Sequence, residues 1–208
     1  MERYVIGMTF SKRLLDLSCA LVLLIVLGPV ILITALVILW LDGRPVFYIS
    51  ERMKTVTEGF NLIKFRTMKP VTEDSGVSGG DKSARITWTG PFLRRTRLDE
   101  LPQLWNVIRG DISFIGPRPP LRQYVERFPE IYGNVLKSRP GVSGLASIYF
   151  HAHEEHLLAR SHSAEETDAI YCRVCIPRKA RIDLIYQARR NLCVDIGIML
   201  KTVFKRLR

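Results

Sequence analysis

Residues 17–41 read "LSCALVLLIVLGPVILITALVILWL", and this stretch decides the fold because it carries no charge and is rich in Leu, Val and Ile. Its 25 residues have the composition of a membrane segment. As an unbroken helix it would extend about 37 Å, whereas the hydrocarbon core of a bilayer is about 30 Å thick. It is too long for the apolar part of a secretory signal, and no small-residue cleavage site precedes the charges that follow. We therefore expect a membrane anchor.

The centre and the flanks of this run bear on whether it crosses the membrane. Gly28-Pro29 interrupts it, and proline removes a backbone donor, so we expect a bend there with arms about one leaflet long. Lys12 and Arg13 precede the run, and Arg44 is the first of several basic residues that follow it. The positive-inside tendency favours a helix that enters, bends and returns. Proline-kinked helices also span bilayers, so the residues alone leave both topologies open.

The basic charge of the chain, +11 in total, is concentrated near the C-terminus, where residues 178–208 contain nine Lys and Arg against two Asp. A basic tail suits nucleic acid or an anionic membrane surface, and beside an apolar anchor we expect the membrane and no nucleic acid. Residues 192–204 interleave apolar side chains with Lys201. This segment is either an interfacial helix or a core-packing helix with a solvated basic edge.

The soluble part begins with a predicted hairpin. Residues 44–68 alternate apolar and polar side chains around Thr57-Glu58-Gly59, which is typical of two short antiparallel strands. Residues 71–85 are rich in Gly, Ser and Asp and predict a mobile loop, either a lid over a substrate or a passive linker.

Histidines and cysteines form two compact patterns. His151, His153 and His156 have a spacing that invites a metal interpretation, but no carboxylate stands at a familiar distance from them, which disfavours it. Cys172 and Cys175 form a CxxC without the second pair of a zinc site. We expect the four cysteines of the chain to be packing residues in a reducing compartment.

The pair Asp99-Glu100 stands among arginines. Asp99 has a structural explanation as the N-cap of a helix over residues 99–108 that ends at Gly110. The surrounding arginines carry more charge than two carboxylates need, and guanidinium groups match phosphate oxygens; they are Arg94, Arg95, Arg97, Arg109 and Arg118. A carboxylate beside phosphate requires screening, usually by Mg²⁺, and an aspartate so screened can attack phosphorus.

Four blocks in fixed order carry a resemblance to a known family. They are Lys12-Arg13 with Asp16 before the apolar run, "KFRTM" at 64–68, "LRRTRLDELPQLWNVIRGDISFIGPRP" at 93–119 and "RPGVSGLA" at 139–146. Together they resemble the bacterial sugar transferases, that is, the monotopic phosphoglycosyl transferases.

The resemblance implies an α+β architecture on the cytoplasmic face of the bacterial inner membrane, in contact with its phospholipids. Residues 1–42 would form a re-entrant helix broken at Gly28-Pro29. Residues 43–208 would form a small, mostly helical catalytic domain with a short hairpin and interfacial amphipathic helices, the last of them basic. The resemblance also leaves room for a homodimer.

The resemblance further implies a Mg²⁺-dependent transfer of a sugar 1-phosphate from a UDP-sugar to a polyprenol phosphate, with release of UMP, as the first membrane step of glycoconjugate or exopolysaccharide synthesis. The nucleophile of the family falls on Asp99. Glu100 is its partner and, with Asp99, a metal ligand. The candidates for binding phosphates are Lys64, Arg66, Arg94 and Arg118.

Two departures from the family pattern limit the resemblance. Gly28 precedes the proline where the family often has serine, and residues 147–151 replace a Gln and Gly-Arg pattern, so the identity of the sugar does not follow. Two other classes remain as alternatives. A basic membrane adaptor would depend little on Asp99, and a membrane phosphohydrolase would use water as the acceptor.

Overall fold

The computed structural model describes residues 9–71, 76–77 and 79–206. Its first element is a single long helix, α1 (Phe10–Leu41), whose start is capped by the Thr9 hydroxyl, which accepts the Lys12 amide at 3.2 Å. Among the described residues α1 is the one helix that is long and apolar enough to cross a membrane. Most of its apolar side chains are exposed.

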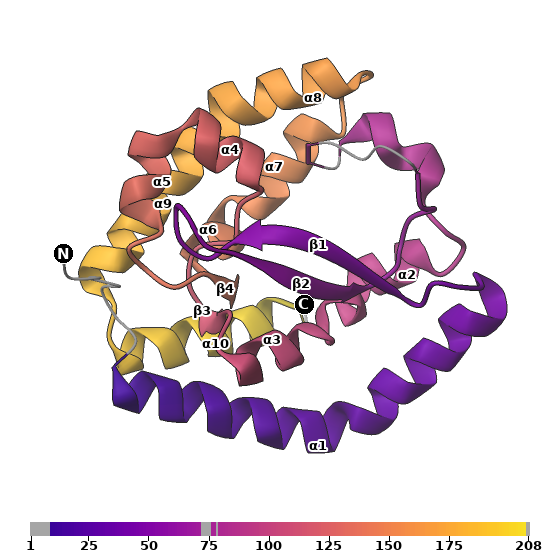
Figure 1. Ribbon diagram of the computed structural model, residues 1–208, viewed down its shortest axis with the longest axis horizontal. Helices are drawn as coiled ribbons and strands as arrows, with labels where there is room; N and C mark the ends of the chain where they lie inside the picture. The colour runs from indigo at the N-terminus through magenta and orange to yellow at the C-terminus, as the bar shows by residue number, and fades with distance from the viewer. Residues whose placement is uncertain (1–8, 72–75, 78, 207–208) are drawn as a thin grey trace.

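The predicted break at Gly28-Pro29 is wrong as a break, since α1 stays helical through both residues. Pro29 removes one helical hydrogen bond, while the bonds before and after it hold the helix together. Instead of breaking, α1 curves along its length, with its concave side toward the rest of the molecule (Figure 1).

Both ends of α1 are docked on the remainder of the chain. Near the start, Arg13 donates to the carbonyl oxygens of Val107 and Ile108, each at 2.6 Å. At the other end Arg66 donates to the carbonyl oxygens of Asp42 and Gly43, at 2.6 and 2.8 Å. The helix is therefore fastened at both ends to the same body.

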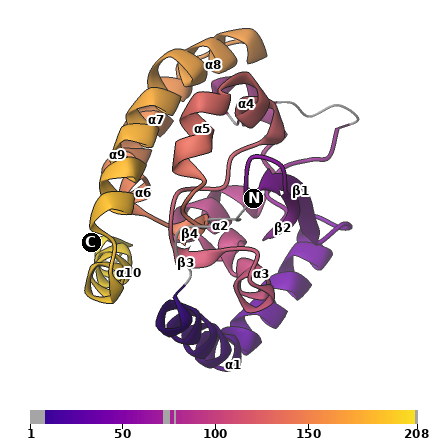
Figure 2. The same cartoon turned by 60° about the vertical axis from the view of Figure 1, so that its left-hand side comes forward.

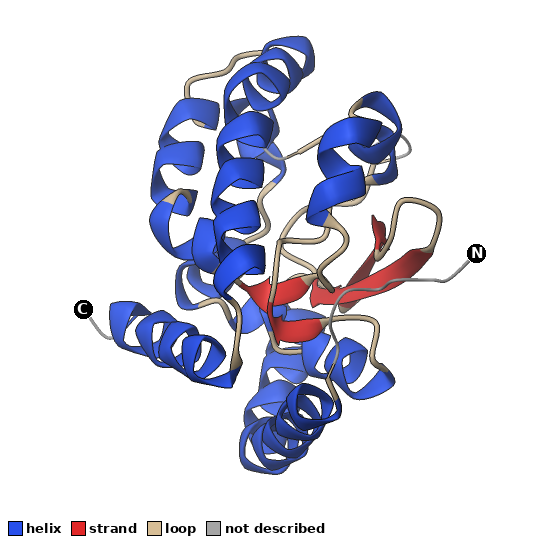
Figure 3. Cartoon of the chain, turned by 90° about the vertical axis from the view of Figure 1, so that its left-hand side faces the viewer, coloured by secondary structure: helices blue, strands red, loops and turns tan. Residues whose placement is uncertain are grey.

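The strands form two small sheets between helices. The predicted hairpin is confirmed as antiparallel strands β1 (Phe47–Met53) and β2 (Gly59–Phe65). A second, parallel pair joins β3 (Ser113–Ile115) to β4 (Gly141–Ser143). The sheets lie between α1 on one side and a group of helices on the other (Figure 3).

Short helices make up most of the remaining chain, so the mixed helix and strand class is confirmed. After the hairpin come the 3₁₀ turn η1 (Gly80–Arg85), α2 (Gly90–Thr96), the 3₁₀ turn η2 (Leu98–Glu100), α3 (Gln103–Arg109), α4 (Arg122–Arg127) and α5 (Pro129–Val135). Then follow α6 (Leu145–Tyr149), α7 (His151–Leu158), α8 (Ala164–Ile170), the π turn η3 (Tyr171–Cys175), α9 (Ile176–Arg189) and α10 (Leu192–Arg206).

The predicted mobile loop over residues 71–85 is corrected in part. Residues 72–75 and 78 lie outside the described residues, but 80–85 form the turn η1. This turn is held against α8, because Thr167 donates its hydroxyl to Asp81 at 2.8 Å. A side chain at Gly80 would meet the carbonyl oxygens of Ala159 and Ser161, so the backbone approach is close.

The main core lies between the hairpin and helices α4, α5 and α9 and is centred on Met53, Tyr124 and Ile176. Cys172 and Cys175 are free thiols buried in this core, as expected of packing residues, whereas Cys193 is exposed and does not fit that expectation. No group of three or more His, Cys, Asp or Glu side chains gathers as a metal site within the described ranges.

Helix α10 has one face packed in the core, as the core-packing interpretation predicted, while its interfacial role stays a prediction. One face packs Ile198 against β3 and α6, and Lys12 of α1 forms an ion pair with Asp195 at 2.9 Å. The opposite face leaves apolar side chains exposed: Leu192, Ile196, Leu200, Val203 and Phe204. Both views show α10 beside the first turns of α1 (Figures 1 and 2).

Candidate active site

The Asp-Glu pair sits in a tight turn between two helices. Arg97 adopts the left-handed conformation, with φ of 60°, so that it ends α2 and starts η2. A non-glycine residue in this region carries backbone strain of about 1–3 kcal/mol, which is typical of functional sites. The prediction that Asp99 caps the following helix is wrong, because α3 begins at Gln103 with Pro102 as its N-cap. Its end at Gly110, with φ of 83°, is confirmed.

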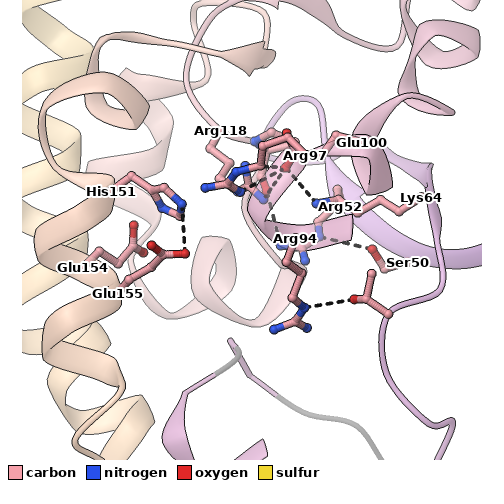
Figure 4. Close-up of polar contacts among 12 residues, drawn as sticks. Ser50, Arg52, Lys64, Arg94, Arg97, Glu100, Arg118, His151, Glu154 and Glu155 are labelled. Carbon is pink, nitrogen blue, oxygen red and sulfur yellow. Dashed lines mark hydrogen bonds and ion pairs between the residues drawn. The ribbon is translucent and has the colours of Figure 1, made fainter. Parts of the chain in front are cut away.

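Three basic side chains surround Glu100 at this turn. Its Oε1 accepts a hydrogen bond from Lys64 Nζ at 3.2 Å and lies 3.3 Å from Arg118 and 3.7 Å from Arg97 (Figure 4). Burial alone would raise the pKa of Glu100, but Lys64, Arg118 and Arg97 outweigh it and hold that pKa well below its usual range. Glu100 therefore favours its ionised form and holds Lys64 and Arg118 by hydrogen bonds.

Asp99 is buried beside Glu100 but differs from it in its hydrogen bonds. Its Oδ1 has no hydrogen-bond partner among the described residues. Burial raises the pKa of Asp99, and the charge of Glu100 adds to this, against the opposing effect of Lys64. A buried oxygen without a partner is rare in folded proteins and calls for a functional explanation.

A cavity of about 820 Å³ opens at this turn, and Asp99, Lys64 and Arg118 line it. Its volume is in the range of ligand pockets. Arg52 and Arg97 also line it, whereas Arg95 and Arg109 do not. Arg97 was among the surplus arginines noted in the sequence, and Arg52 was missed. The alternation of the hairpin could have identified Arg52, because Tyr48 and Ser50 stand on the same face of β1 and line the same cavity.

The four residues predicted to bind phosphate all line the cavity, but their side chains have different partners. Lys64 and Arg118 meet at Glu100, and Arg94 lines the same cavity while its Nε donates to the Thr67 hydroxyl at 3.0 Å. Arg66 also borders the cavity, but its guanidinium is engaged by the end of α1.

The opposite side of the cavity comes from α7 and α9, which the sequence did not connect with the site. His151 of α7 faces the cations and lies 3.2 Å from Glu155 (Figure 4). Burial, followed by the charges of Arg97 and Arg118, lowers the pKa of His151 to about 3, so its imidazole is neutral at physiological pH.

The carboxylates at the turn suit a divalent cation. Mg²⁺ takes one or two carboxylates and completes its shell with water and substrate oxygens. Asp99 Oδ1, a buried oxygen without a partner, is the kind of donor that such an ion would use, and Glu100 stands next to it. The residues present therefore fit the predicted ion.

The chain thus combines a long apolar helix docked at both ends with a buried carboxylate that faces a cation-lined cavity. The chain matches the family described as bacterial sugar transferase over residues 7–208, and it belongs to that family. The predicted resemblance is thereby confirmed.

Individual relatives support the same family. The chain is 31% identical, over 93% of its length, to the UDP-N-acetylgalactosamine-undecaprenyl-phosphate N-acetylgalactosaminephosphotransferase of Aeromonas hydrophila. It is 32% identical, over 96% of its length, to the UDP-glucose:undecaprenyl-phosphate glucose-1-phosphate transferase of Klebsiella pneumoniae. It is 39% identical, over 66% of its length, to the uncharacterized sugar transferase EpsL of Bacillus subtilis. These matches span 43%, 40% and 67% of the respective relatives.

Proposed function

We propose that this protein transfers a sugar 1-phosphate from a UDP-sugar to a polyprenol phosphate and releases UMP, as an early step in surface glycan synthesis. The observation that carries the proposal is the unpartnered Asp99 oxygen in a cavity lined by cations. The names of the Aeromonas and Klebsiella relatives, which specify undecaprenyl phosphate and a UDP-sugar, supply the substrate classes.

The chemistry proceeds in two displacements at one phosphorus. Asp99 attacks the sugar-bearing phosphorus, a bond from phosphorus to aspartyl oxygen forms, and the bond to the UMP oxygen breaks. An oxygen of the lipid phosphate then attacks the same phosphorus and releases Asp99 in its original state. The raised pKa of Asp99 reflects a poorly solvated carboxylate, which is more reactive than one dissolved in water.

The neighbours of Asp99 bind the substrate phosphates, hold the metal ion and position α1. Lys64, Arg94 and Arg118 bind phosphate oxygens, and Glu100 holds the first and last of these in position. Asp99 and Glu100 would hold Mg²⁺, which when bound would neutralise charge on the diphosphate. Because Arg66 already binds two backbone carbonyls, we assign it to positioning the end of α1 rather than to the substrate.

The docking of α1 favours re-entry into the membrane over a full span. A spanning helix would place its ends on opposite sides, about 30 Å apart, and both could not contact one soluble body. Arg13 contacts α3, and Asp42 accepts the Trp88 amide at 3.1 Å just before α2. We therefore propose an anchor in residues 1–42 and a cytoplasmic catalytic part in residues 43–208, at the inner face of the bacterial inner membrane.

The exposed apolar side chains fit this topology. Trp40 near the end of α1 is 85% exposed, and the outer face of α10 exposes Leu200 and Phe204. Such surfaces are stable when phospholipid covers them. With this topology we expect both a soluble nucleotide sugar and a lipid phosphate to reach the cavity.

The reaction is tested by measuring UMP release from a panel of UDP-sugars with Mg²⁺ in detergent, with and without polyprenol phosphate. We expect turnover that needs the lipid, and an intact-mass adduct of one sugar phosphate when the lipid is left out. Asp99→Asn should lack both. Free sugar phosphate without lipid would identify a phosphohydrolase, and salt-sensitive membrane binding without turnover would identify an adaptor.

The topology is tested with single cysteines in a background that lacks the four native ones. Ser11→Cys reports on the start of α1, and Val56→Cys on the hairpin turn is the matched cytoplasmic control. We expect both to label only after the inner membrane is permeabilised. Labelling of Ser11→Cys from the periplasm would refute re-entry. Pro29→Leu restores the missing backbone donor and should shift the helix toward a full span.

A further inference from the structure

We propose that the side of the cavity formed by α7 and α9 binds the hydroxyl groups of the transferred sugar and determines which UDP-sugar is used. We call it the carboxylate wall, defined by His151, Glu154, Lys179 and Asp183, all of which line the cavity. The inference rests on the proposed function and adds to it the residues that choose the donor.

The carboxylate wall differs in charge from the side that carries Asp99. Around Asp99 the cavity is lined by Lys64, Arg94 and Arg118, which suit phosphate. On the carboxylate wall, the buried Asp183 and the half-buried Glu154 would repel a phosphate and accept hydrogen bonds from neutral hydroxyl groups. The two sides thus match the two chemical halves of a sugar phosphate.

Lys179 connects the two helices that form the carboxylate wall. Its Nζ donates to Glu154 Oε1 at 2.8 Å, joining α9 to α7. The same Nζ lies 3.4 Å from the Tyr171 hydroxyl and 5.2 Å from the centre of that ring. Glu154 is therefore held in one orientation, as selective recognition of a hydroxyl pattern requires.

Asp183 provides the second, independent sign of a ligand. It is 7% exposed, and its Oδ1 has no hydrogen-bond partner in the described part of the chain. It stands one helical turn from Lys179 and lines the same cavity. Burial raises the pKa of Asp183 to about 7, so the group titrates near neutrality. A sugar hydroxyl would satisfy the orphaned oxygen, in either protonation state of the carboxyl group.

Charge favours the sugar over UMP. The sugar is bonded to the phosphorus that Asp99 attacks and offers neutral hydroxyl groups, whereas UMP carries a phosphate that Glu154 and Asp183 would repel. His151 and Glu154 line the same cavity as Arg118, and Figure 4 shows His151 pointing toward Arg118, so the wall adjoins the side proposed to hold the reacting phosphate. The margin at η1 carries Lys82 and Arg85 and suits the phosphate of UMP.

The test compares the full-length wild type with Asp183→Asn and Glu154→Gln, using UDP-glucose, UDP-galactose and their N-acetylamino counterparts as donors. For each donor kcat/KM is measured, together with inhibition by UMP. Glu165→Gln, an exposed carboxylate on α8, is the matched control. Thermal unfolding of each variant verifies that it is folded. Asn and Gln preserve the shape of the side chains they replace, and the two variants probe the wall from different helices.

We expect the ratio of kcat/KM between the best donor and its competitors to change by about tenfold or more in at least one of the two variants. Inhibition by UMP should stay within about twofold of the wild type, because UMP lacks the sugar. Unchanged donor ratios in folded, active variants would overturn the inference alone. An equal loss for all donors with weaker UMP inhibition would also overturn it, in favour of uridine binding. A wild type that releases UMP from no donor would overturn the proposed function and this inference with it.

Discussion

Two buried clusters of charge, one at Asp99-Glu100 and one at Lys12, have similar residues but opposite balance. At the first, Lys64, Arg97 and Arg118 surround Glu100. The cluster faces a cavity of about 820 Å³.

At the second, Lys12 lies between two carboxylates, 3.1 Å from Asp16 and 2.9 Å from Asp195. Tyr186 donates to Asp195 at 2.7 Å. The adjoining cavity of about 90 Å³ is too small for a nucleotide. The difference teaches that buried charge alone does not mark a site. A surplus of phosphate-binding cations and room for a ligand do.

The largest expected effect separates the clusters by activity. Asp99→Asn should lower kcat by about 10⁴-fold or more, because it removes the nucleophile. Its melting temperature at pH 7.5 should equal or exceed that of the wild type. Burial raises the pKa of Asp99 above its unfolded value, so ionising this group costs more in the folded chain than in the unfolded chain, and an amide removes that cost. A much lower melting temperature of Asp99→Asn would show that the cluster at Asp99-Glu100 stabilises the fold, as the cluster at Lys12 does.

The second effect concerns stability. Lys12→Met leaves two buried carboxylates without their cation and should lower the free energy of unfolding by about 3–5 kcal/mol. Chemical unfolding in detergent measures it. The control is Lys54→Met, which removes an exposed ion pair with Glu58 and should change stability by about 0–1 kcal/mol. Adding Asp195→Asn to Lys12→Met should recover part of the lost stability. Equal losses of stability in Lys12→Met and Lys54→Met would show that the cluster at Lys12 has no special role.

The smallest expected effect is on the pH dependence of kcat/KM, and it tests the role of Lys64 in the first cluster. Burial lowers the pKa of Lys64 to about 8, despite the opposing charge of Glu100. The side chain is protonated below that pH and loses its charge above it. We expect kcat/KM to fall above pH 8 by up to about tenfold per unit. In Lys64→Arg the side chain keeps its proton throughout this range, so the fall in kcat/KM above pH 8 should disappear. An unchanged fall in the variant would assign the titration to another group.

Sequence patterns captured the local elements and missed the assembly of the site. The hairpin and the helix end at Gly110 follow from alternation and turn residues, which act over a few positions. Asp99 was placed in the wrong element, since a left-handed Arg97 separates α2 from the turn and no local pattern predicts such strain. The Gly28-Pro29 pair predicted a break where hydrogen bonds on either side keep the helix continuous.

The sequence by itself determined the apolar anchor, the ordered blocks of the family and the Asp99-Glu100 pair, because composition and short-range spacing record them directly. Only the tertiary structure decided which cations meet Glu100, since Lys64 and Arg118 are 36 and 18 positions away from it. It alone engaged Arg66 at the end of α1 and brought His151 and Asp183 to the cavity. Such contacts arise when separate helices and strands pack around one core, and no local periodicity encodes them.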